Sequence, residues 1–152
     1  MDGGDHQVTG WRHEIVKDGE WAGWVLYGND PFEEHAGPFY YREDGRGRRV
    51  CAMRAERKHM NGGGFMHGGA LMTFADYCLF VIARDALSDT HSVTATFNSE
   101  FVGAVPEGSL VECTGEVVRN ARSMVFVRGL MTANGEPVLS FSATLKKTRP
   151  RA

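Results

Sequence analysis

The sequence predicts an α+β fold in which an antiparallel sheet of six strands wraps around one long central helix. The helix is indicated by residues 70–83, which contain no proline or glycine and are apolar on almost every side. The sheet is indicated by alternating segments joined through short turn signals, of which Asn134-Gly135 is the strongest. A helix that is apolar all round cannot leave one side in water. The sheet must therefore curl around it, or a second copy of the chain must cover the rest.

An N-terminal arm, residues 1–37, is expected ahead of a single domain, residues 38–152. Within the arm, residues 11–27 form either a hairpin that turns at Asp18-Gly19 or a short helix over residues 20–27. All three tryptophans lie in this segment. The segment either packs over an otherwise exposed apolar face or lines a ligand tunnel.

The rest of the chain predicts one short helical turn and the six strands. The turn is expected from Phe32 to His35, after Pro31. In the strand that follows the central helix, alternation places Val93 and Phe97 on one face and Thr94 on the other. The six predicted strands are residues 39–41, 49–57, 93–101, 110–119, 124–132 and 139–145.

Composition excludes several classes of protein. A formal net charge of -2 gives no reason to expect nucleic acid as a partner. The cysteines number three and are scattered, which favours free thiols in a reducing compartment. The N-terminus lacks a signal-peptide pattern, and the apolar helix contains Asp76 and is shorter than the roughly 18 residues of a membrane span. We therefore expect a cytoplasmic protein that does not associate with membranes.

The glycine-rich run at residues 61–69 precedes the central helix. The first N–H groups of a helix have no partner within the helix, and the helix dipole adds partial positive charge there. With Gly68 and Gly69 at this end, no side chain blocks a ligand from the backbone, so the run is a candidate oxyanion hole. The alternative is a turn whose glycines serve only close packing or a positive φ.

Asp76 is the single carboxylate on the apolar helix. An unpaired carboxylate there is costly, which points to a general base or nucleophile with a raised pKa. The alternative is an aspartate that bonds to the backbone or lies at a dimer seam. His67 and Asp76 are nine residues apart, about 13 Å along a helix axis. If both serve one site, a second subunit must supply one of them. A zinc site built from His59, His67 and Asp76 fails on spacing, so no metal is expected.

The ordered set of Asn61, Gly64, His67-Gly68-Gly69 and Asp76 resembles the signature of hotdog-fold acyl-CoA thioesterases. The resemblance is to the phenylacetate-pathway (PaaI-like) branch of the 4-hydroxybenzoyl-CoA thioesterase superfamily, and it covers about residues 38 to 147. Thr94 stands where this branch has a serine or threonine. The resemblance implies a hotdog fold, a homodimer or a dimer of dimers, an acyl-CoA substrate and no cofactor.

The resemblance also implies a role for each matching residue. The N–H at Gly68 polarises the thioester carbonyl, and Asn61 and His67 support that site. Asp76 of the partner subunit attacks or activates water, which Thr94 helps to place. For the substrate we expect an apolar or aryl acyl group, beside Gly69 and the apolar side chains of Phe65, Met66, Tyr77 and Phe80. The candidate cations for the phosphates of coenzyme A are Arg119, Arg122, Arg57, Lys58 and the basic tail. The alternative for each cation is a solvated surface charge.

Two other functions fit the same pattern. One is a module that binds or senses acyl-CoA without catalysis, which would have no use for Asp76. The other is a hotdog hydratase or dehydratase, which would leave the thioester intact. Release of a free thiol from acyl-CoA separates both from a thioesterase.

Overall fold

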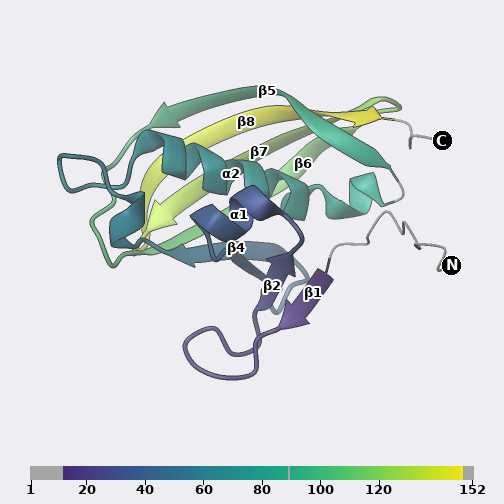
Figure 1. The fold of residues 1–152 in the computed structure, drawn as a ribbon. Coiled ribbons are helices and arrows are strands. Elements are labelled where there is room, and N and C mark those ends of the chain that lie inside the picture. Colours follow the sequence, from purple (N-terminus) through teal and green to yellow (C-terminus); the bar gives the residue numbers. More distant parts are fainter. Residues whose placement is uncertain (1–11, 89, 149–152) are drawn as a thin grey trace, which may run out of the picture.

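The computed structural model describes residues 12–88 and 90–148 and shows one antiparallel sheet that curves around helix α2 (Gly68–Ile82) (Figure 1). The short helix α1 (Pro31–Ala36) contacts α2. Two 3₁₀ turns, η1 (Arg57–His59) and η2 (Arg84–Leu87), lie on either side of α2 in the chain. The strands are β1 (Arg12–Ile15), β2 (Val25–Gly28), β3 (Tyr40–Glu43), β4 (Arg49–Arg54), β5 (His91–Phe101), β6 (Leu110–Asn120), β7 (Met124–Ala133) and β8 (Glu136–Thr148).

The sheet has eight strands in the order β1-β2-β3-β4-β6-β7-β8-β5, so the prediction of six was wrong by two. The additional pair is a hairpin in which Ile15 pairs with Val25, and β2 extends the sheet by pairing with β3. The helix considered for residues 20–27 is absent. The turn contains Gly19 and Gly23 at positive φ, a conformation in which glycine costs little.

The tryptophans within the described residues cover the face of the sheet away from α2. Trp21 stacks on Tyr40 with ring centroids 4.3 Å apart, and Trp24 packs with Tyr40 and Ala52. Ala52 points away from the core that contains its neighbours Cys51 and Met53, because side chains alternate along a strand. The packing interpretation is confirmed for Trp21 and Trp24, whereas Tyr27 of the same segment lines a cavity. Trp11 lies outside the described residues.

Helix α2 is buried on most of its surface. Leu71, Phe74, Cys78 and Leu79 pack into the core formed by the inner face of the sheet. The prediction of complete burial does not hold for one stripe, where Gly69, Met72, Thr73 and Asp76 reach the surface to differing degrees. This stripe runs lengthwise along the helix because residues three and four positions apart share a face.

Strand β5 is an edge strand with a bulge between Thr94 and Thr96. The extra residue of a bulge shifts the alternation of side chains by one position. Phe97 packs against the core, but Val93 is 52% exposed and Thr94 bonds to α2. The prediction that Val93 and Phe97 share one face was therefore wrong.

Asp76 lies in the middle of helix α2. Within the described residues, no helix is long and apolar enough to cross a membrane. In that same part of the chain, no group of three or more His, Cys, Asp or Glu side chains is placed to hold a metal ion. The three cysteines are free and buried.

Candidate active site

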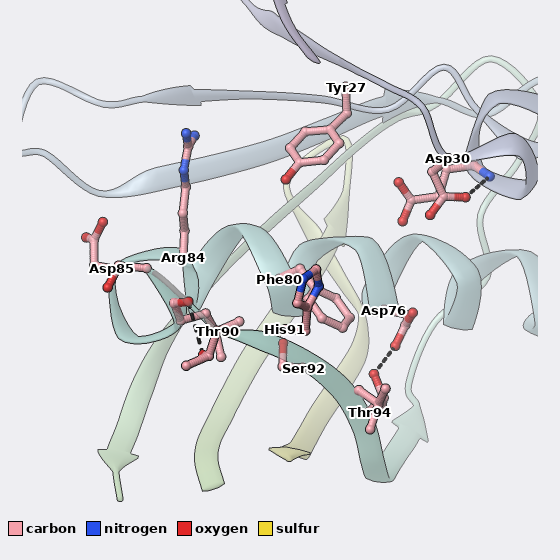
Figure 2. Close-up of a pocket in the computed structure, with 14 residues that line it drawn as sticks. Tyr27, Asp30, Asp76, Phe80, Arg84, Asp85, Thr90, His91, Ser92 and Thr94 are labelled. Atoms are coloured by element: carbon pink, nitrogen blue, oxygen red, sulfur yellow. Dashed lines mark hydrogen bonds between the residues drawn. The ribbon is translucent and has the colours of Figure 1, made fainter. Parts of the chain in front are cut away.

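Asp76 and Thr94 form the central contact of the site. The Thr94 hydroxyl donates a hydrogen bond to Oδ1 of Asp76 across 2.6 Å, which joins the middle of α2 to the start of β5 (Figure 2). The bulge in β5 turns Thr94 toward the helix, so this contact depends on an irregularity in the strand. Oδ2 of Asp76 has no hydrogen-bond partner among the described residues.

A cavity of about 700 Å³ opens beside this pair. In Figure 2, Tyr27 reaches toward it from the opposite side to Thr94, while Phe80 lies between them on α2. Burial raises the pKa of the Tyr27 phenol, so its hydroxyl stays protonated. The remaining lining is mostly polar. It consists of Asp30, Glu33, Arg84, Asp85, Leu87, Ser88, Thr90, His91, Ser92 and Val93.

The glycine-rich loop is fixed by Asn61. Its side-chain oxygen accepts hydrogen bonds from the N–H groups of Gly63 at 2.9 Å and Phe65 at 3.2 Å. The loop turns at Gly64, whose φ of 85° favours glycine. Asn61 thus holds the shape of the loop that leads into α2.

His67 is the N-cap of α2, and its Nδ1 accepts a hydrogen bond from the Gly69 N–H at 2.9 Å. The Gly68 N–H at the first helical position has no hydrogen-bond partner within the described part of the chain. A Cβ at Gly68 would lie 3.3 Å from the ring of Phe101, so this position is tight for any side chain. The end of the helix therefore presents one unused N–H donor beside an aromatic ring.

The two halves of the predicted site do not meet within one chain. Eight residues separate Gly68 from Asp76 on the same helix, which amounts to about 12 Å of rise. Between them, Gly69, Thr73 and Asp76 line a groove of about 370 Å³ together with α1. The groove follows the exposed stripe of α2 from Gly69, the residue after Gly68, to Asp76.

Glu33 is a site residue that the sequence did not indicate. It lines both the cavity and the groove beside Asp76, and burial, followed by repulsion from Asp30 and Asp76, raises its pKa to about 8. Its position in the first turn of α1, where Asp30 is the N-cap, is typical of a solvent-exposed acid. No local signal distinguishes it, because its burial results from the packing of α1 on α2.

The other residues predicted to bind the substrate differ in their burial and in the cavities that they line. Met66 and Tyr77 are buried in the core, although Tyr77 lines a second cavity of about 410 Å³ together with Glu33. Phe65 is exposed in the glycine-rich loop. Arg119 and Arg122 are exposed near the β6–β7 turn and do not line the cavity at Asp76.

The architecture, a curved antiparallel sheet around one helix, is the hotdog thioesterase fold, and the sequence comparison agrees. The chain belongs to the thioesterase superfamily, whose family model matches residues 63–139. A Pseudomonas aeruginosa protein named "Putative esterase PA0474" is 30% identical over 118 residues, which cover 77% of this chain and 88% of that protein. A Caenorhabditis elegans protein with a similar name is 25% identical over 76% of this chain and 73% of its own length.

Solved structures share the fold. A variant of the phenylacetic acid degradation protein PaaI from Thermus thermophilus has a TM-score of 0.68 at 23% identity, covering 78% of this chain and 100% of that one. PaaI from Escherichia coli has a TM-score of 0.68 at 18% identity, covering 79% and 86%. A hypothetical thioesterase from Streptococcus pneumoniae, solved with coenzyme A, has a TM-score of 0.65 at 21% identity, covering 75% and 88%.

Proposed function

We propose that this protein is an acyl-CoA thioesterase that uses Asp76 as its base or nucleophile. The observation that carries the proposal is the hydrogen bond from Thr94 to Asp76 beside a cavity of about 700 Å³. The bond orients the carboxylate and leaves its second oxygen available for chemistry. Membership of the thioesterase superfamily supports the same reaction, as do fold neighbours solved with coenzyme A.

The residues support hydrolysis in two steps. Asp76 takes a proton from a water molecule that Thr94 helps to place, and the water oxygen attacks the thioester carbon. The resulting oxyanion accepts a hydrogen bond from the Gly68 N–H. The tetrahedral intermediate then releases the thiolate of coenzyme A, which takes up the proton held by Asp76, and the free acid leaves. In the alternative route an oxygen of Asp76 attacks the carbon and the thiolate of coenzyme A leaves, which gives an anhydride. Water then cleaves the anhydride into the free acid and the Asp76 carboxylate, and the proton released goes to the thiolate.

The separation of Gly68 from Asp76 favours a site shared between two subunits. One carbonyl cannot contact two groups about 12 Å apart on one helix. The exposed stripe of α2 and the edge strand β5, with Val93 and Phe101 about half exposed, offer a surface for a second copy. A homodimer, alone or as half of a tetramer, would bring the Gly68 of one subunit to the Asp76 of the other.

The acyl group would occupy the cavity at Asp76, where Phe80 provides an apolar wall that suits an apolar or aryl group. The cations for coenzyme A would be the exposed Arg119 and Arg122. The three free, buried cysteines fit a reducing compartment such as the cytoplasm.

The test is release of free thiol from a panel of acyl-CoAs, with Asp76→Asn as the key variant. The wild-type protein should release thiol, and the variant should lose about 10²–10⁴-fold in kcat, the contribution of a general base, while still binding substrate. Thr73→Ser, one turn away on the same stripe, is the matched control and should keep normal activity. Near-normal turnover by Asp76→Asn would contradict the assignment.

A further inference from the structure

Glu33 lies where a second carboxyl can act on the chemistry of Asp76. It is on α1, whereas Asp76 is on α2, and both side chains line the groove of about 370 Å³ and the cavity of about 700 Å³. The two carboxyls therefore face shared space from two different elements.

One oxygen of Glu33, Oε2, is buried and has no hydrogen-bond partner among the described residues. A buried polar atom without a partner is costly, and such atoms in folded proteins call for an explanation. Protonation of the carboxyl lowers this cost, because a neutral group is less costly to bury than an anion. Contact with a water molecule in the adjoining cavity falls to the other oxygen, Oε1, which is not enclosed in the same way.

The charged neighbours do not neutralise Glu33. Lys58 shares the second cavity with it, but its ammonium donates to the carbonyls of His35 and Gly37. Arg84 donates to Tyr41 and contacts His13. No ion pair within the described residues includes Glu33. The other titratable groups that share its three cavities are Glu14, Tyr27, Asp30, Glu34, Asp76, Tyr77, Asp85 and His91.

We propose that Glu33 is a positioning residue of the active site, which holds the attacking water beside Asp76 through a hydrogen bond from its own carboxyl group. This inference rests on the proposed hydrolysis. Glu33 makes and breaks no covalent bond in it, and the proton of the water still goes to Asp76.

The protonation of Glu33 fits this role. Burial, followed by repulsion from Asp30 and Asp76, raises its pKa to about 8, so its carboxyl keeps a proton at neutral pH and can donate it in a hydrogen bond. Above that pH the donor is lost and a second anion stands beside Asp76. The value of kcat should then fall as pH rises through about 8.

The kinetic test compares Glu33→Gln, which keeps an N–H donor but cannot ionise, with Glu33→Ala, which has no donor. Glu33→Gln should retain kcat within about 3-fold at pH 7 and lose the alkaline fall. Glu33→Ala should lower kcat about 10-fold, the effect of one hydrogen bond, and leave KM nearly unchanged. Glu34→Gln, the neighbouring exposed acid, is the matched control and should keep the wild-type profile. An unchanged alkaline fall in Glu33→Gln, or a wild-type kcat in Glu33→Ala, would overturn the proposal.

A second measurement does not depend on turnover. In protein labelled with ¹³C at glutamate carboxyl groups, one NMR signal should titrate near pH 8 and be absent in Glu33→Gln. In Asp76→Asn its midpoint should move to lower pH, because the repulsion from Asp76 is gone. A midpoint in the ordinary range of glutamate, or one that Asp76→Asn does not move, would overturn the role of Glu33. Absence of thiol release from every acyl-CoA, with the titration as expected, would instead count against the proposed function alone.

Discussion

The first turn of α2 and its middle are built in different ways. At the first turn, Asn61 and His67 bond to backbone N–H groups only two to four residues away. In the middle, Asp76 meets Thr94 from β5, 18 residues further along the chain, and lies near Glu33 from α1. The first region is a local motif, whereas the second is assembled by tertiary packing. Changes at the first should therefore act through the backbone, and changes at the second through side chains.

Gly68→Pro gives the largest expected effect at the first turn. Proline is favoured at the first helical position, and the extended backbone of His67, with φ -60° and ψ 137°, suits a residue that precedes proline. The substitution removes the N–H that would bind the oxyanion, so kcat should fall about 10²–10³-fold.

Gly68→Ala is the control for this variant because it keeps the N–H and brings a similar Cβ close to Phe101. It should lose much less activity than Gly68→Pro. Equal losses in the two variants, measured by thiol release and with unchanged circular dichroism, would show that crowding, and not the donor, matters at this position.

Substitution of Thr94, the β5 residue that bonds to Asp76 in the middle of α2, should lower activity by a smaller factor. Thr94→Val removes the hydroxyl that bonds to Asp76 but keeps the shape, so kcat should fall about 10-fold for one lost hydrogen bond to a charged group. Thr94→Ser retains the hydroxyl and should stay close to wild type. If Thr94→Val were as active as Thr94→Ser, the hydrogen bond would not contribute to turnover.

Glu33 should make stability depend on pH. Its pKa is raised in the folded protein from 4.5 to about 8, so the folded state keeps a proton that the unfolded state releases above about pH 4.5. This contribution to the free energy of unfolding therefore declines as pH rises from about 4.5 to about 8 and is level above that. Glu33→Gln lacks the decline.

Urea unfolding at several pH values measures this difference. Glu33→Gln should gain stability relative to wild type as pH rises from 5 to 8, while Glu34→Gln should show no such trend. If the stability difference between Glu33→Gln and wild type stayed constant from pH 5 to 8, the pKa of Glu33 would not be raised in the folded protein.

The sequence was sufficient for the local motif and for most elements. The glycine-rich loop, His67 as the residue before α2, and the strands β6, β7 and β8 were all predictable because each depends on nearby residues or on regular alternation. The bulge after Thr94 was not, since the segment alternates without a glycine or proline that would mark an extra residue. The burial of Glu33 and the pairing of β2 with β3 depend on contacts between distant segments, which no local pattern reports.

The most direct measurement of a site shared between subunits combines two inactive proteins. Asp76→Asn and the double variant Asn61→Ala/His67→Ala are unfolded, mixed in equal amounts and refolded. Random pairing makes half of the dimers mixed, and each mixed dimer holds one intact site of two, so about a quarter of wild-type thiol release should return. Recovery in the mixture, absent when either variant refolds alone, is the expected result. A mixture that remains as inactive as its components would contradict a shared site.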